Sequence, residues 1–129
     1  MILEIPSDDL DEAIDLLTTD EVTVYPVRVS QILFSVWNQF KGHKIRRVIQ
    51  PLPATEPWVV WANESLENYE LLWNFGMDII DEHARLYGDV AKYPYKHGSS
   101  RMMEELGALP PLPSVGLTEK PKATLCTKS

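Results

Sequence analysis

The segment Asn63–Gly88, NESLENYELLWNFGMDIIDEHARLYG, has the clearest periodicity in the chain. Apolar and aromatic residues recur in it every three or four positions, which is the spacing of one face of an α-helix. These residues are Leu66, Tyr69, Leu72, Trp73, Met77, Ile80, Ala84 and Tyr87. Ser65 can cap the start of this helix, and Gly88 can end it. We therefore predict one long central helix in which Met77 and Ile80 are buried.

Two helices are predicted on the N-terminal side of the central one. Residues 7–18 place apolar side chains on one face and acids on the other, and Ser7 is the expected N-cap. A second helix is predicted to begin near Pro26, because proline suits the first helical turn, and to end at Gly42. Residues 22–25 are interpreted either as an extended connector or as the lead-in to that helix.

Two shorter helical segments are also predicted. Pro57 is suited to open a helical turn within residues 56–61. Residues 100–106 have the pattern of a short helix, which Gly107 closes. The chain is therefore expected to place three to four helices around residues 65–87.

The last part of the chain is rich in proline. Proline favours extended backbone, and these prolines follow one another closely. They are Pro110, Pro111, Pro113 and Pro121. The predicted fold class is mainly α: a single small helical domain, residues 1–108, built around the long central helix. An extended proline-rich C-terminal arm follows over residues 109–129.

The acidic residues of the chain are concentrated at its N-terminus. The chain has 129 residues and a formal net charge of −7, and its first 21 residues hold eight of the 19 acids and neither Lys nor Arg. The remaining residues are nearly neutral, with 11 acids and 12 bases. Proteins that bind nucleic acids usually present a basic face, so nucleic-acid binding is expected to be weak at most.

Several classes of protein are disfavoured by composition. The N-terminus lacks the features of a signal peptide, and no apolar stretch reaches the roughly 20 residues of a membrane helix. The single cysteine, Cys126, excludes an intrachain disulfide. His43, His83 and His97 lack metal-ligand spacing, so we predict neither a metal nor a cofactor. A cytoplasmic protein without membrane contact is expected.

One basic cluster, KGHKIRR, occupies Lys41–Arg47. It directly follows the second predicted helix, where cations complement the negative end of the helix dipole. One interpretation is a solvated helix terminus. The other is a phosphate-contacting loop in which Arg46 and Arg47 make the contacts, because guanidinium groups match phosphate oxygens.

Polar residues also lie at both ends of the central helix. Asp81 and Arg85 have the spacing of an ordinary i,i+4 ion pair near its C-terminal end. Asn68 and Tyr69 form a polar patch near its start. Two interpretations of this patch stay open. Its amide and hydroxyl groups either hold the helix to a neighbouring loop or contact a ligand.

The run PWVVWANESLENYELLWNFGMDIIDEHARLYGDVAK, residues 57–92, resembles a group of small phage proteins with a pattern like HPxxxWxxxSxxNYxWLxxLxxxLxxEYxxRYGKxHK. The matching positions are Trp61, Ser65, Asn68, Tyr69, Leu72, Arg85, Tyr87, Gly88 and Lys92. The group is distantly similar to the all-helical pyrimidine-dimer DNA glycosylases of phages. The resemblance implies a helical scaffold with a ligand-binding surface on its matched polar positions.

Three positions depart from that family pattern. Glu56 stands where the family has a histidine before the proline, and Ala91 stands where it has a histidine after Tyr-Gly. Asp89 replaces the lysine beside Tyr-Gly. The histidines and the lysine that the family has at these positions are the residue types that could transfer protons or contact phosphate. The resemblance therefore implies a scaffold that is kept and a chemistry that is lost.

We accordingly predict a non-catalytic accessory protein of the phage type, located in the host-cell cytoplasm if phage-encoded. It would act by binding a host or phage protein or a nucleotide-like small molecule. The expected ligand-binding residues are Asn68, Tyr69, Arg85, Tyr87 and Lys92, which combine aromatic, amide and cationic groups. One alternative is a DNA-repair or DNA-modification enzyme related to the pyrimidine-dimer DNA glycosylases. Another is a structural component of a virion or of its assembly. A homo-oligomer is compatible with each.

Overall fold

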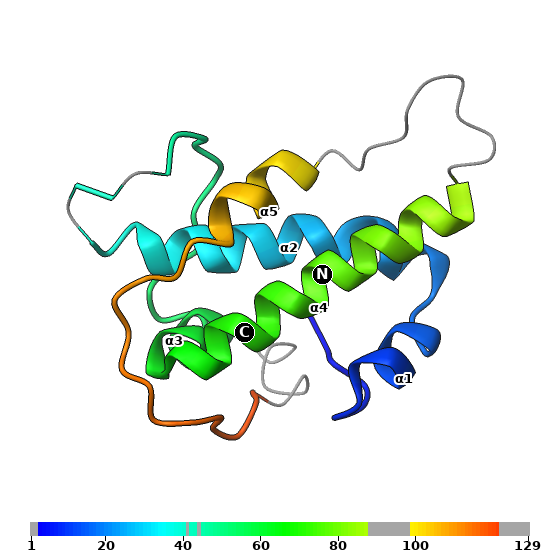
Figure 1. Cartoon of the computed structure of the whole chain (residues 1–129), viewed down its shortest axis with the longest axis horizontal. Helices are drawn as coiled ribbons and strands as arrows, with labels where there is room; N and C mark the ends of the chain where they lie inside the picture. Colours follow the sequence, from blue (N-terminus) through cyan, green and yellow to red (C-terminus); the bar gives the residue numbers. More distant parts are fainter. Residues whose placement is uncertain (1–2, 41, 44, 88–98, 122–129) are drawn as a thin grey trace.

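The computed structural model describes residues 3–40, 42–43, 45–87 and 99–121. Across these residues the fold contains five helices and no strand (Figure 1). The helices are α1 (Leu10–Asp15), α2 (Thr19–Trp37), α3 (Pro57–Glu64), α4 (Leu66–Tyr87) and α5 (Ser100–Leu106). The prediction of a mainly α fold around one long central helix is confirmed, with α1, α2, α3 and α5 described around α4. None of the described helices combines the length and the apolar character needed to cross a bilayer.

The hydrophobic core lies where α4 crosses α2. Helix α4 packs most extensively on α2 and also contacts α1, α3 and α5, so each described helix is in contact with it. Figure 1 shows α2 and α4 side by side, with α3 beside the start of α4 and α1 towards its other end. The largest fully buried side chains are Trp58, Trp61, Tyr25, Tyr69, Phe75, Ile32, Leu33, Leu72, Ile79, Met103, Leu106 and Val22.

The buried face of α4 is shifted from the face that the sequence predicts. Ile80 is buried as expected, but Met77 is only half-buried. Phe75 and Ile79 are fully buried instead. Gly76 is buried beside them, and a Cβ there would lie 2.9 Å from a methyl group of Val29 in α2 and 2.7 Å from the Met103 Cε in α5. Side chains of both helices therefore pack directly against Gly76.

Helix α2 begins earlier than predicted. The Thr18 hydroxyl accepts a hydrogen bond from the Glu21 N–H at 3.2 Å, and the Glu21 carboxylate accepts one from the Thr18 N–H at 2.8 Å. This capping box satisfies two backbone donors at the helix start. Residues 22–25 are therefore helical, and Pro26 lies inside the helix rather than at its beginning. The helix also ends earlier, with Asn38 as its C-cap, whereas Gly42 lies in the loop beyond.

Helix α1 is shorter than the predicted segment 7–18. Its N-cap is Asp9 rather than Ser7, because the Asp9 carboxylate accepts from the backbone N–H groups of Asp11 and Glu12. The Ser7 hydroxyl instead accepts from the Asp9 N–H at 3.2 Å. The expected amphipathic helix is present, with Ala13 and Ile14 on its buried side.

Helix α3 begins at Pro57, and Glu56 caps it. One Glu56 carboxylate oxygen accepts from the Trp58 N–H at 2.9 Å and from the Val59 N–H at 3.1 Å. These are two of the backbone donors that a helix start leaves without an intrahelical partner. Glu56 thus has a structural function in this chain.

We expect Glu56→Ala to lower the free energy of unfolding by about 0.5–2 kcal/mol, because two N–H groups lose their acceptor. Glu56→Gln keeps an acceptor oxygen at the same position and should retain part of that stability. Urea denaturation of both variants would measure the difference. Equal stability of Glu56→Ala and the parent chain would show that the cap does not matter.

The proline-rich arm wraps around α3 and α4 (Figure 1). In its described part the Leu66 N–H donates to the Pro113 carbonyl at 2.9 Å. The Glu67 carboxylate accepts from the Gly116 N–H at 2.8 Å and from the Ser114 hydroxyl, and these donors hold its pKa below the usual range. Gly116 has a φ of 92°, which a glycine adopts without strain. The arm is therefore attached to the start of the central helix.

Candidate ligand-binding site

Asn68, a predicted ligand-binding residue, is completely buried. Its amide nitrogen donates to the Trp61 carbonyl at 2.7 Å and to the Thr118 hydroxyl at 2.8 Å. Its amide oxygen accepts from the Thr118 N–H at 3.0 Å. The side chain thus ties α3, α4 and the C-terminal arm together. This geometry corresponds to the structural interpretation, in which the amide holds the helix to a neighbouring segment.

Tyr69 is also completely buried. Its hydroxyl donates to the Leu106 carbonyl at the end of α5 and accepts from the Trp37 indole N–H at 2.8 Å. Burial raises the pKa of this hydroxyl. Tyr69 therefore joins α2, α4 and α5 through its hydrogen bonds, and its hydroxyl stays protonated at physiological pH.

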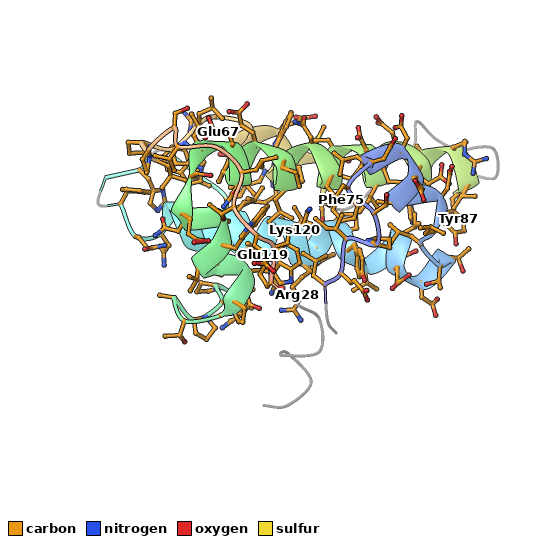
Figure 2. All side chains as sticks on the ribbon, turned by 90° about the horizontal axis from the view of Figure 1, so that it is seen from below. Arg28, Glu67, Phe75, Tyr87, Glu119 and Lys120 are labelled. Carbon is orange, nitrogen blue, oxygen red and sulfur yellow. The ribbon has the colours of Figure 1, made fainter. Side chains whose placement is uncertain are left out.

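Arg85 and Tyr87 lie at the other end of α4. Figure 2 shows Glu67 and Tyr87 at opposite ends of the molecule, and a helical rise of 1.5 Å per residue places Tyr69 and Arg85 about 25 Å apart. Tyr87 packs beside His83, with ring centroids 4.6 Å apart. The predicted residues of α4 therefore do not form one site, and Lys92 lies outside the described residues.

The ion pair of Arg85 differs from the predicted one. Its guanidinium makes two hydrogen bonds, 2.7 and 2.8 Å long, to the Glu82 carboxylate rather than pairing with Asp81. A fork of this kind fits both carboxylate oxygens, which favours the i,i+3 partner in this rotamer. The pair lowers the pKa of Glu82.

The basic loop contributes to a cleft on the surface. Arg46 and Arg47 line a cavity of about 530 Å³ together with Arg101, Glu104 and Glu105 of α5. One Glu105 oxygen accepts from the Arg46 backbone N–H at 2.9 Å, and the other lies 3.5 Å from the Arg47 Nε. Glu105 therefore holds the loop against α5, and all three arginines line the same cavity. We call these five residues the arginine cleft.

Arg101 was not among the residues predicted from the sequence. It is distant in sequence from Arg46 and Arg47, and only the packing of α5 against the core brings it to the same cavity. Its position in the first turn of α5 was the one available signal, because a basic residue there is unfavourable beside the positive end of the helix dipole. Such a residue is a candidate for contact with an anion.

A second cavity, of about 400 Å³, adjoins the arginine cleft through Glu105, which lines both. It is lined by Trp37, Gly42, His43, Ile45, Glu105 and Ala108. We call it the apolar pocket, because most of its lining residues are aromatic or aliphatic. The Trp37 and His43 rings lie side by side in its wall, with centroids 6.4 Å apart. Pockets of 300–1,000 Å³ with a few polar groups are typical of small-molecule sites.

An acidic hollow of about 380 Å³ lies between α1 and α4. Its residues are Asp11, Ile14, Asp15, Asp78, Asp81, Glu82 and Arg85. Burial raises the pKa of Asp78, and the neighbouring carboxylates of Asp81 and Asp11 add to this shift. Among the described residues, no three His, Cys, Asp or Glu side chains are grouped in a way that could hold a metal ion.

The arginine cleft and the apolar pocket together form the best-defined candidate site. They combine guanidinium donors, a carboxylate and aromatic faces within one region between the loop after α2 and the helix α5. Comparisons of the chain with protein-family models, with curated proteins and with solved structures find no match.

Proposed function

We propose that this protein is a non-catalytic accessory protein of the phage type that acts by binding a nucleotide-like ligand. The phosphate of the ligand lies on Arg46, Arg47 and Arg101. The observation that carries this proposal is that three arginines line one cavity, beside a pocket whose lining includes Trp37 and His43. Guanidinium forks bind phosphate oxygens in pairs and keep their charge at any physiological pH.

The hydrogen bonds of the site support binding rather than acid–base catalysis. One Glu105 oxygen accepts from the Arg46 N–H, and the other faces the Arg47 side chain, so both oxygens are used to hold the loop. His43 Nδ1 accepts from the Ile45 N–H at 3.3 Å, so this ring nitrogen is used to shape the loop. These groups are positioned to hold a ligand.

We expect Arg46→Ala, Arg47→Ala and Arg101→Ala each to weaken the binding of a nucleoside 5′-monophosphate about tenfold. A hydrogen bond to a charged group contributes about 1.5–3 kcal/mol, and 1.4 kcal/mol corresponds to a factor of ten. Isothermal titration calorimetry at 0.15 M salt would measure the change. Circular dichroism of each variant should remain that of the parent chain, because the three side chains are exposed.

Lys120→Ala is the matched control for loss of one positive charge. Lys120 pairs with Asp8 at 2.8 Å, and Figure 1 draws this end of the arm along the edge of the molecule opposite α5. Its removal should leave the affinity unchanged. Arg85→Ala tests the C-terminal end of α4, where the sequence predicts a ligand-binding residue. Loss of nucleotide binding in this variant would place the site at that end of α4 instead of at the arginine cleft.

Duplex DNA is the probe for the alternative function. A protein with one basic cluster and eight acids in its first 21 residues should bind it more weakly than micromolar at physiological salt. Tighter binding would overturn the proposal in favour of an enzyme related to the pyrimidine-dimer DNA glycosylases. Absence of binding to every phosphate-bearing probe would overturn it as well.

A further inference from the structure

We infer that the ligand is a single mononucleotide, with its phosphate in the arginine cleft, its ring in the apolar pocket, and Glu105 between them accepting a hydrogen bond from it. This inference rests on the proposed function and specifies the ligand class. It follows from three properties of the described residues: the shared wall of the two cavities, the balance of charge in the cleft, and the chemistry of the pocket.

The shared wall places the two binding regions one side chain apart. Glu105 lines both cavities, so a ligand that occupies both must pass this carboxylate. A phosphate joined to a planar ring by one sugar has the required form, with an anionic end and an apolar end. A free phosphate would fill only the arginine cleft, and a nucleoside would fill only the apolar pocket.

The charge balance of the cleft suits one phosphate group. Its described lining residues are three arginines and two glutamates. Glu104 and Glu105 therefore offset two of the three positive charges and repel a second phosphate placed further along. A nucleic-acid strand, which carries one negative charge per nucleotide, needs a continuous basic groove. The cleft is accordingly matched to a monophosphate.

The apolar pocket suits a planar ring. Trp37 and His43 offer aromatic faces, and Ile45 and Ala108 supply aliphatic contacts around them. The Trp37 indole N–H is fixed by its hydrogen bond to the Tyr69 hydroxyl, so this part of the wall is held in place before a ligand arrives. Bases stack favourably on such surfaces, and a preformed wall reduces the ordering cost of binding.

Glu105 is positioned to select ligands that carry a hydrogen-bond donor. Its carboxylate has about four acceptor sites. One oxygen contacts the Arg46 N–H, and the other contacts the Arg47 Nε. The remaining acceptor sites can receive a ring N–H or a sugar hydroxyl. These two sources share the same donor chemistry, and ribose and 2′-deoxyribose ligands distinguish them.

The test varies the ligand and fills the pocket. Inorganic phosphate, ribose 5-phosphate, a nucleoside, its 5′-monophosphate and a short single-stranded oligonucleotide are titrated by calorimetry into the full chain. The monophosphate should bind at least tenfold more tightly than phosphate, ribose 5-phosphate or the nucleoside, because stacking adds about that factor. The oligonucleotide should bind no more tightly than the monophosphate. The inference is overturned by equal affinity for phosphate and the monophosphate, or by preference for the strand.

Ala108→Phe fills the apolar pocket without touching the arginines. Ala108 is exposed, so the larger side chain is tolerated by the fold, which circular dichroism would verify. The affinity for the monophosphate should fall to that for ribose 5-phosphate, while phosphate binding should remain unchanged. Unchanged monophosphate affinity would overturn the location of the ring and leave the proposed phosphate site intact.

Glu105→Gln tests the donor contact separately. The amide oxygen can still accept from the Arg46 N–H, but the variant loses the charge. The ratio of affinities for ligands with and without a hydrogen-bond donor should fall several-fold relative to the parent chain. A comparison of the ribose and 2′-deoxyribose monophosphates shows whether this donor is a sugar hydroxyl or a ring N–H. If discrimination does not change, Glu105 does not select the ligand. Unchanged phosphate binding in Arg47→Ala, by contrast, would overturn the proposed function, on which the assignment of the ring and of Glu105 rests.

Discussion

Leu72→Ala is expected to lower the free energy of unfolding by about 2–5 kcal/mol. Leu72 is fully buried near the middle of α4, within the core that α4 forms with α2, α3 and α5. Removing its isobutyl group loses buried apolar area and leaves a cavity that the surrounding side chains only partly refill. Alanine has the highest helix propensity, so the loss reports packing rather than helix formation.

Leu86→Ala is the matched control, because Leu86 lies on the same helix and its side chain is 38% exposed. It should change stability by no more than about 0.5 kcal/mol. Urea denaturation monitored by circular dichroism would compare the two variants at the same pH and salt. An unchanged midpoint for Leu72→Ala would show that the buried face of the central helix is assigned wrongly.

Local signals in the sequence correctly predicted the start of α3, the start of α4 and the end of α5. Ser65 caps α4 as expected, since its hydroxyl accepts from the Asn68 N–H at 3.1 Å, and Pro57 and Gly107 mark the start of α3 and the end of α5. Each of these contacts joins residues that are close in sequence. Spacing along the chain therefore contains enough information to predict them.

The start of α2 was missed because two local signals compete there. Pro26 is typical of a first helical turn, whereas Thr18 and Glu21 have the spacing of a capping box. The capping box determines the start, and proline is accepted inside the helix at the loss of one backbone donor. The T-x-x-E pattern of Thr18 and Glu21 is therefore a better predictor of the start of α2 than Pro26 is.

The candidate site was predicted only in part, because its members meet through tertiary packing. Arg46 and Arg47 were predicted from a local cluster, and both line the cleft. Arg101 and Ala108 belong to a later segment of the chain, and they reach the site because α5 packs on the core. The sequence left two interpretations of Asn68 and Tyr69 open for the same reason, since their partners Thr118 and Leu106 come from distant segments.

Asn68→Asp is expected to lower the free energy of unfolding by about 3–5 kcal/mol at neutral pH, as is typical of a buried charge without a partner. The amide nitrogen that donates to the Trp61 carbonyl at 2.7 Å becomes an oxygen, so two acceptors face each other in a completely buried position. The amide nitrogen also donates to the Thr118 hydroxyl in the parent chain, and the oxygen that replaces it cannot. We therefore expect the C-terminal arm to detach from α4 before the core unfolds.

The loss of stability in Asn68→Asp should become larger as the pH rises. Burial and the facing carbonyl raise the pKa of the introduced carboxyl in the folded state, whereas its unfolded pKa stays near 3.9. Between these two values the folded state binds more protons than the unfolded state, so stability relative to the parent chain falls as pH rises. The deficit should be smallest below about pH 4, where the protonated carboxyl can donate to the Trp61 carbonyl, and should level off above the folded pKa.

Two controls separate the buried contact from the change of charge. Asn74→Asp makes the same replacement at an exposed position of α4 and should change stability by about 0.5 kcal/mol or less. Asn68→Ala removes the hydrogen bonds without adding a charge, so its deficit relative to the parent chain should not vary with pH. Hydrogen exchange at the Thr118 amide, which donates to Asn68, measures detachment of the arm directly. If that amide remains protected in Asn68→Asp at neutral pH, Asn68 does not hold the arm, and its burial would need another cause.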